Sequence, residues 1–206
     1  MWGGFPKRIE YGDIESQKKY LNELNSTIVL NDIITRFKIR QTEVFKRLVN
    51  YILISNARIF SARSIADYMK TNSVKCSVTT ILKYIGYLEK AYVVAPVKLY
   101  STKAKRELNY YQKMYNEDVS FNSIHIFDNR YDITHNFENA VYNELIYMGY
   151  KVQVFNDGKH EIDFIANKEG KTFYIQKIVI SNDEIDYSTS TVRHIQFKDF
   201  VMMKEL

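Results

Sequence analysis

Residues 42–90 constrain the fold most, because three helical patterns follow one another there and a β-like pattern comes directly after them. In residues 42–56, four apolar side chains recur at helical spacing and form one face: Phe45, Leu48, Val49 and Ile52. Residues 64–70 form a second, short pattern, which Ser64 can cap with Asp67 in the capping-box position. The sequence therefore predicts a group of amphipathic helices packed against a sheet.

The third helical pattern, in residues 77–90, separates apolar from polar side chains. Its apolar face holds Val78, Ile81, Leu82, Ile85 and Leu88. Its opposite face holds Thr79, Thr80, Lys83, Tyr84, Tyr87 and Lys90. Two β-like runs follow, residues 91–100 and 108–115, and the basic segment STKAKR joins them. Because Pro96 has no backbone N–H, we expect the first run to be an edge strand.

This order of elements is that of a winged helix, in which the last helix enters the major groove of DNA and the hairpin wing contacts phosphates. The side chains that suit these two tasks are Thr79, Thr80, Lys83, Tyr84, Lys98, Lys103, Lys105 and Arg106. Residues 1–112 carry 19 Lys and Arg against 9 Asp and Glu, whereas residues 113–206 carry 10 against 15. A basic region of this kind is typical of nucleic-acid binders. A solvated basic surface on a protein-interaction domain is the alternative.

Residues 113–206 follow a different pattern, in which one helix precedes three strands. A helical face ends at Gly149, and it consists of Phe137, Val141, Leu145 and Met148. Strands are expected at residues 152–155, 160–166 and 172–179, with Asp157–Gly158 as a hairpin signal. The sequence therefore predicts an α+β protein with two regions, 1–112 and 113–206.

Two carboxylates lie in the middle one of these three strands. Glu161 and Asp163 share a face, because alternate residues of a strand point the same way. Ala166 can pair with Thr172 or with Phe173 of the next strand. The second register is favoured, because it places Asp163 opposite Gln176 on a polar face and keeps it away from the apolar one. Glu138, early in the preceding helix, can reach the same face, on which we expect no basic side chain. A face of solvated carboxylates is the alternative.

Seven short segments occur in an order that resembles one known family. They are GGFP, LNDIITR, GYLEKAYVV, KMYNED, FENAVYNEL, GYKVQVF and EIDFIANKEGKTFYIQ. Together they look like the C-terminal module of prokaryotic AAA-type ATPases, in which a winged helix precedes a lobe similar to PD-(D/E)XK nucleases. The resemblance covers nearly the whole chain. It implies a DNA-related role, and it implies the ATPase domain of the full-length protein as a partner.

The resemblance also implies a site in the nuclease-like lobe. The helical Glu of the nuclease motif falls on Glu138, its strand Asp on Asp163, and its second-strand acid on Gln176. Glu138 and Asp163 would be the ligands of Mg²⁺ or Mn²⁺, which prefer oxygen donors and activate water.

The sequence departs from the family pattern in three places. It has no Gly-x-x-x-x-Gly-Lys-Ser/Thr stretch, so we expect a fragment without the ATPase domain that binds no nucleotide. Ile178 stands where the nuclease lysine belongs, and Lys177 alternates to the other face. Between Ile180 and Val192 the chain is shorter than the family pattern. We therefore expect a catalytically degenerate nuclease-like site.

Three functions stay open at this point. The favoured one is a DNA-binding module of an ATPase, and the alternatives are a metal-dependent DNA nuclease and a protein-interaction domain without a nucleic-acid role. The single cysteine, Cys76, is typical of a cytoplasmic protein. No apolar run approaches the ~20 residues that span a bilayer, so we expect no membrane partner.

Overall fold

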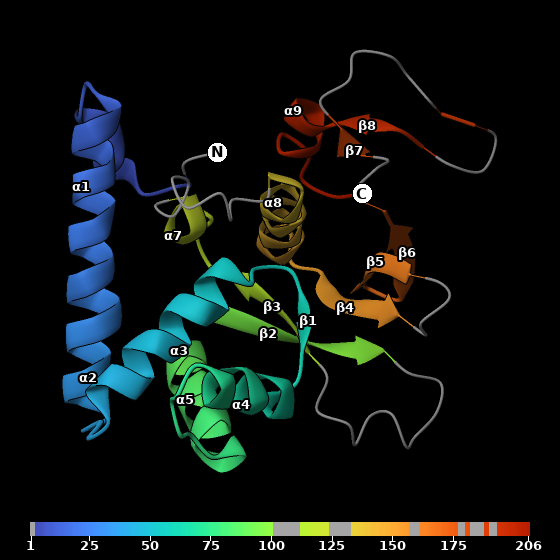
Figure 1. The fold of residues 1–206 in the computed structure, drawn as a ribbon. Coiled ribbons are helices and arrows are strands. Elements are labelled where there is room, and N and C mark those ends of the chain that lie inside the picture. The colour runs from blue at the N-terminus through green and yellow to red at the C-terminus, as the bar shows by residue number, and fades with distance from the viewer. Residues whose placement is uncertain are drawn as a thin grey trace.

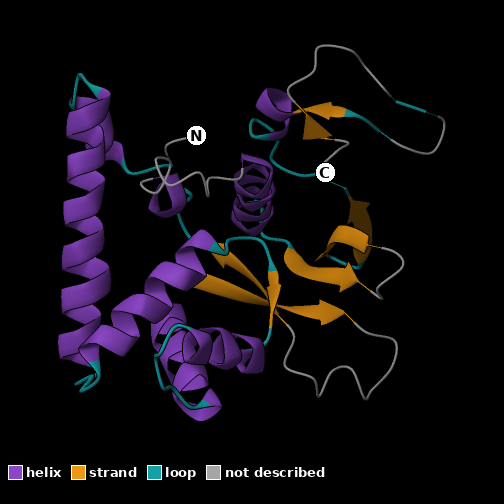
Figure 2. Cartoon of the chain, viewed as in Figure 1, coloured by secondary structure: helices purple, strands orange, loops and turns teal. Residues whose placement is uncertain are grey.

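A six-stranded sheet with the order β1-β3-β2-β4-β5-β6 runs through both predicted regions, and helices lie on both of its sides (Figures 1 and 2). The computed structural model describes residues 3–100, 112–123, 133–156, 161–176, 180–181, 188–189 and 193–206. The fold is α+β, as the sequence predicts. In the described part of the chain, no helix combines the length and the apolar character needed to cross a membrane.

The N-terminal helices form one continuous rod along a side of the molecule (Figure 1). A short 3-10 helix, η1 (Pro6–Glu10), precedes α1 (Ile14–Leu24), the π-helical segment η2 (Asn25–Asp32) and α2 (Ile33–Arg36). Asp13 caps α1, because its carboxylate accepts a hydrogen bond from the Ser16 N–H at 2.8 Å. The segment η2 thus joins α1 to α2 without a break.

The next elements are α3 (Thr42–Ile54), β1 (Ile59–Phe60), α4 (Ala62–Thr71) and α5 (Val78–Lys90). Their apolar faces build the first core together with Val93, Val94 and Met114. The predicted cap of α4 is displaced by one turn: Ser61 is the N-cap, and Ser61 and Ser64 form the capping box reciprocally. A serine pair satisfies these orphan N–H groups as well as the expected Ser64–Asp67 pair would.

Strands β2 (Val94–Tyr100) and β3 (Gln112–Asn116) are antiparallel, and β3 also pairs with β1. The expectation that Pro96 marks an edge strand is wrong, because β2 lies between β3 and β4 (Lys151–Asn156). The physical reason is local: β4 pairs with β2 only at Leu99 and Tyr100, beyond the proline. No partner in the described sheet therefore needs the missing N–H of Pro96.

After β3, the second region continues with α7 (Ser120–Ser123) and α8 (Ile133–Tyr147), followed by β4, β5 (Glu161–Lys168) and β6 (Lys171–Ile175). Gly149 ends α8 as predicted, with a φ of 86° that glycine adopts without strain. Strands β4, β5 and β6 form the expected antiparallel meander. Ala166 lies opposite Phe173, which confirms the second of the two registers. The Asp157–Gly158 hairpin signal lies outside the described residues.

Strand β3 separates two hydrophobic cores. Met114 points into the first core, and Tyr115 belongs to the second core, under α8. The second core also takes Phe200 of α9 (Phe197–Phe200), which follows the short parallel strands β7 (Ile180–Ser181) and β8 (Ile195–Gln196). Alternation along one strand thus fixes which β3 side chains can meet α8.

Candidate functional site

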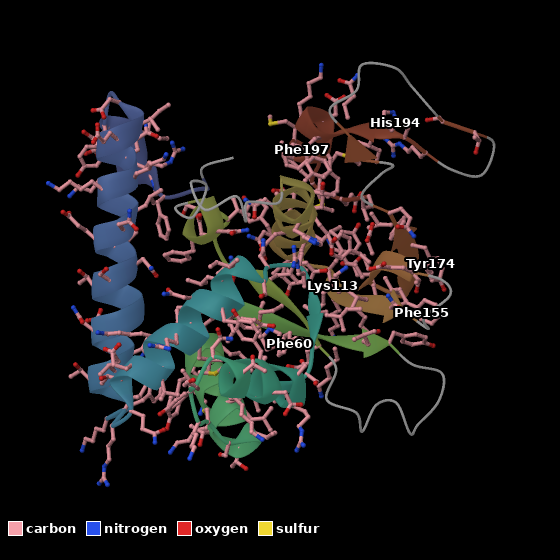
Figure 3. All side chains as sticks on the ribbon, viewed as in Figure 1. Phe60, Lys113, Phe155, Tyr174, His194 and Phe197 are labelled. Carbon is pink, nitrogen blue, oxygen red and sulfur yellow. The ribbon has the colours of Figure 1, made fainter. Side chains whose placement is uncertain are left out.

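A buried ion-pair cluster lies between β3, α8 and β5, and Lys113 is at its centre (Figure 3). The Lys113 Nζ atom is 2.6 Å from Glu138 Oε1 and 3.2 Å from Glu161 Oε1. The side chain of Lys113 is 5% exposed and that of Glu138 is 0% exposed, whereas that of Glu161 is 50% exposed. We call Lys113, Glu138 and Glu161 the charged cluster. It connects a strand of the first sheet half to a helix and a strand of the second.

Tyr115 completes the surroundings of Glu138. Its hydroxyl donates a hydrogen bond to Glu138 Oε1 at 2.9 Å, and its ring stacks on Tyr142 at 4.2 Å between centroids. Burial raises the pKa of Tyr115 well above its ordinary value, and the negative charges of Glu138 and Asp163 raise it further. Tyr115 therefore stays protonated and remains a hydrogen-bond donor to the carboxylate at every ordinary pH.

Asp163 and Gln176 take different positions in this region. Asp163 is 4% exposed, so the open polar face expected for it is instead covered. Gln176 follows β6 directly, and its Nε2 donates a hydrogen bond to the backbone carbonyl of Glu161 at 2.6 Å. The structure thus places Glu138, Glu161 and Asp163 around Lys113 and Tyr115, while the side-chain amide of Gln176 binds backbone.

The expectation that no basic side chain shares the acidic face is wrong. Lys113 comes from β3, in the KMYNED segment. In the sheet, β2 and β4 separate β3 from β5, which carries Glu161 and Asp163. The sequence contained one usable signal: Lys113 and Tyr115 stand two residues apart in a strand and therefore share a face. A partner for the lysine could not be assigned without knowing that β3 packs under α8.

The charged cluster does not offer the donor set of a divalent metal ion. Lys113 brings an ammonium group against Glu138, where a cation would have to bind. Within the described residues, no group of three or more His, Cys, Asp or Glu side chains could hold a metal ion. We therefore assign no chemical step to a metal here.

A second candidate site is the outer face of α5. Ser77 caps the helix, since its hydroxyl accepts a hydrogen bond from the Thr80 N–H at 3.1 Å. Thr79 and Lys83 are exposed, and Thr80 is half-buried. Lys98 of β2 is also exposed. Thr79, Lys83 and Lys98 present a hydroxyl and two ammonium groups to solvent, whereas the Thr80 hydroxyl is hydrogen-bonded to the Ser77 hydroxyl at 2.9 Å.

Tyr84 does not belong to this face. It is 6% exposed, and its ring packs edge-on against Phe45 in the first core at 5.3 Å between centroids. The helix is rotated so that Tyr84 points inward, and Leu82, predicted to be apolar core, is exposed instead. The remaining predicted contacts, Lys103, Lys105 and Arg106, lie outside the described residues.

Comparisons with known proteins give one family and two relatives. A protein of Haemophilus influenzae described as uncharacterized is 28% identical over 195 residues, which are 95% of this chain and 48% of the relative. An uncharacterized protein of Methanocaldococcus jannaschii is 25% identical over 185 residues, which are 82% of this chain and 38% of the relative. The chain thus spans less than half the length of these two relatives. No solved structure matches.

The family comparison covers the first sheet half and the helices around it. The match spans residues 1–126, from the N-terminus through α7, and so includes α3, α4, α5 and β3. This is more than half of the chain. The protein belongs to the family described as Domain of unknown function (DUF8612).

Proposed function

We propose that this chain is a DNA-binding module, in which α5 and the β2–β3 connection contact duplex DNA. The observation that carries the proposal is the order helix, strand, helix, helix, strand, strand with β1 paired to β3 and β3 to β2. This order agrees with the winged helix that we propose, in which the last helix would read the major groove and the hairpin would lie over the backbone. The assignment of α5 as recognition helix rests on this arrangement.

The side chains on these elements support the proposal. Thr79, Thr80 and Lys83 on α5 can donate hydrogen bonds to phosphates or base edges. Lys98 on β2, and Lys103, Lys105 and Arg106 in the connection, would meet the phosphate backbone. The excess of basic residues before residue 113 favours association with a polyanion.

We further propose that the nuclease-like lobe is catalytically degenerate and supports the module. Glu138 is buried and already paired with Lys113 and Tyr115, so a phosphodiester has no path to its carboxylate. Glu138, Asp163 and Gln176 would then be remnants of a nuclease site, and Mg²⁺ or Mn²⁺ would have to displace Lys113 to bind there. In the full-length protein we propose an AAA-type ATPase domain as the partner; the two relatives, of which this chain covers 48% and 38%, leave room for it.

Salt-dependent binding tests the DNA-binding proposal. We expect the wild type to shift duplex DNA in a gel, with an affinity that falls steeply as salt rises, because bound lysines and arginines release counterions. Replacing Lys103, Lys105 and Arg106 together by Gln should weaken binding to all sequences and flatten the salt dependence. Lys19→Gln, at an exposed site on α1, is the control and should change neither. If the affinity for duplex DNA changes neither with salt nor with the triple substitution, the proposal is rejected.

Plasmid nicking tests the alternative of an active nuclease. We expect no cleavage by the wild type with Mg²⁺ or Mn²⁺, because the buried Glu138 is paired with Lys113 and Ile178 offers no charge to the scissile phosphate. Nicking that requires Mn²⁺ and disappears in both Asp163→Ala and Glu138→Ala would show a nuclease instead.

A further inference from the structure

A basic pocket lies beside the outer face of α5, between this helix and the connection from α2 to α3. Its volume is about 550 Å³, and it is lined by Phe37, Lys38, Ile39, Arg40, Gln41, Thr80, Lys83, Tyr84 and Tyr87. Pockets of roughly 300–1,000 Å³ are the size that small ligands occupy. Two of its lining residues, Thr80 and Lys83, also belong to the proposed DNA-binding face.

The charge of the pocket has one sign. Lys38, Arg40 and Lys83 line it, and none of the described lining residues is acidic. All three cations are exposed, and no salt bridge within the described chain engages any of them. Lys83 contacts an aromatic face only, with its Nζ 5.8 Å from the Tyr87 ring centroid. Such a group of cations without counter-charge attracts an anion.

The floor of the pocket is held in place before any ligand binds. Phe37 and Tyr87 stack at 4.0 Å with their planes 7° apart, and Ile39 and Tyr84 are buried beneath. The backbone turns at Lys38, whose φ of 50° lies in the left-handed region, and the Ile39 N–H donates to the Ile34 carbonyl at 3.0 Å. A fixed backbone lowers the entropy that ligand binding costs.

We propose that this pocket binds an unpaired nucleotide of a DNA strand through its phosphates. A phosphate within a regular duplex needs only a flat contact, whereas a hollow of this volume accepts a nucleotide that has left the base stack. Because Phe37 and Tyr87 stack on each other, the contacts that remain are charge and hydrogen bonds from Lys38, Arg40, Gln41 and Lys83. The binding is therefore independent of base sequence. This inference deepens the proposed DNA-binding function and rests on it for the identity of the polyanion.

Fluorescence anisotropy with a short single-stranded oligothymidylate, phosphorylated at its 5′ end, tests the pocket directly. We expect Lys38→Gln/Arg40→Gln to weaken binding at least about tenfold, which corresponds to about 1.4 kcal/mol. Lys19→Gln/Lys70→Gln removes the same charge from exposed sites on α1 and α4 and should leave affinity within about twofold, a shift below 0.5 kcal/mol or so. If the affinity for the oligonucleotide falls equally in both double variants, or falls in neither, the proposal that the pocket binds a nucleotide is rejected.

Two further arms identify the source of the phosphate. At constant ionic strength, inorganic phosphate should compete only weakly with the oligonucleotide; complete displacement would show a general anion site and reject the nucleotide. Duplex binding is measured on the same proteins. If the protein binds duplex DNA but Lys38→Gln/Arg40→Gln does not change its affinity for the oligonucleotide, the pocket proposal is rejected and the DNA-binding proposal stands. Pocket-dependent oligonucleotide binding without any duplex binding supports the pocket and rejects the winged-helix proposal.

Discussion

At the scale of single residues, Lys113–Glu138 is the one salt bridge between described residues in which both side chains are buried. Both are buried, and each supplies the charge that the other needs in a medium of low polarity. We expect Lys113→Met to lower the free energy of unfolding by about 3–5 kcal/mol, because Glu138 is left buried without its counter-charge. Urea denaturation followed by circular dichroism measures this loss.

Glu161 provides the matched comparison, because it contacts the same lysine from a half-exposed position. Glu161→Gln should cost less than about 1 kcal/mol, as exposed ion pairs contribute little. The double variant Lys113→Met/Glu138→Met should recover much of the loss, because no buried charge remains. Equal costs for Lys113→Met and Glu161→Gln would show that burial does not decide the strength of these contacts.

Tyr115 of β3 and Tyr142 of α8 give a prediction about alkaline pH. Burial, followed by the charge of Glu117, raises the pKa of Tyr142 to about 12, and the pKa of Tyr115 is also raised. An unfolded chain loses these protons near pH 10, so the stabilisation is complete below about pH 10 and is lost as pH rises toward about 12. We expect urea midpoints to fall over this range. Tyr142→Phe should make the fall shallower by up to about 1.4 kcal/mol per pH unit; an unchanged slope would contradict the assignment.

Residue-scale prediction from sequence succeeded where a pattern of neighbours decides the environment. Phe45, Leu48, Val49 and Ile52 are all buried as their spacing indicates. The prediction was wrong for Tyr84, which lies at the edge of the apolar face of α5. The orientation of the helix about its axis buries Tyr84 and exposes Leu82. The pairing of Lys113 depends on contacts between β3 and α8, which no local pattern encodes.

At the scale of elements, α8 binds β3 through asparagine side chains as a neighbouring strand would. Asn139 Oδ1 accepts from the Asn116 N–H at 2.7 Å, and its Nδ2 donates to the Asn116 carbonyl at 2.8 Å. Asn143 adds weaker contacts to the carbonyls of Asn116 and Glu117, at 3.3 and 3.0 Å. The backbone N–H and carbonyl of Asn116, at the end of β3, thereby have hydrogen-bond partners where strand pairing ends.

The two asparagines should differ in their contribution to stability. Asn139 is fully buried, so Asn139→Ala should cost about 1–3 kcal/mol by leaving buried backbone groups without a strong partner. Asn143 is partly buried, and Asn143→Ala should cost no more than about 1 kcal/mol, since water can replace its contacts. Thermal and urea unfolding of both variants measure the difference. A larger loss in Asn143→Ala would refute the strand-like role of Asn139.

Element types followed from the sequence more reliably than element partners. The helices at α3, α5 and α8 and the meander β4–β5–β6 lie where periodicity places them. The parallel pairing of β2 with β4 was not predicted, and it is the contact that makes Pro96 part of an interior strand. Parallel pairing between segments far apart in sequence has no turn signal to announce it.

At the scale of the whole molecule, three kinds of contact cross between the predicted regions 1–112 and 113–206. Strand β3 begins at the predicted boundary and pairs back to β1 and β2, and β2 pairs with β4. The buried Asn56 Nδ2 also donates a hydrogen bond to Asn136 Oδ1 at 3.1 Å. Composition shows two regions, because the charge balance changes sign. It does not show their packing, since the groups that join them are buried and few.

These shared contacts predict that the molecule unfolds in one cooperative step. If the cores of α5 and α8 open together, amides of β2 and of β5 should exchange with solvent hydrogen at the same free energy of opening. Lys113→Met, which breaks the ion pair between β3 and α8, should lower that free energy equally in both strands. Hydrogen exchange read by mass spectrometry on peptides covering residues 94–99 and 162–167 compares them directly. Earlier exchange in β5 while β2 stays protected would mean that the two cores are separate cooperative units, because the charged cluster would then contribute to only one of them.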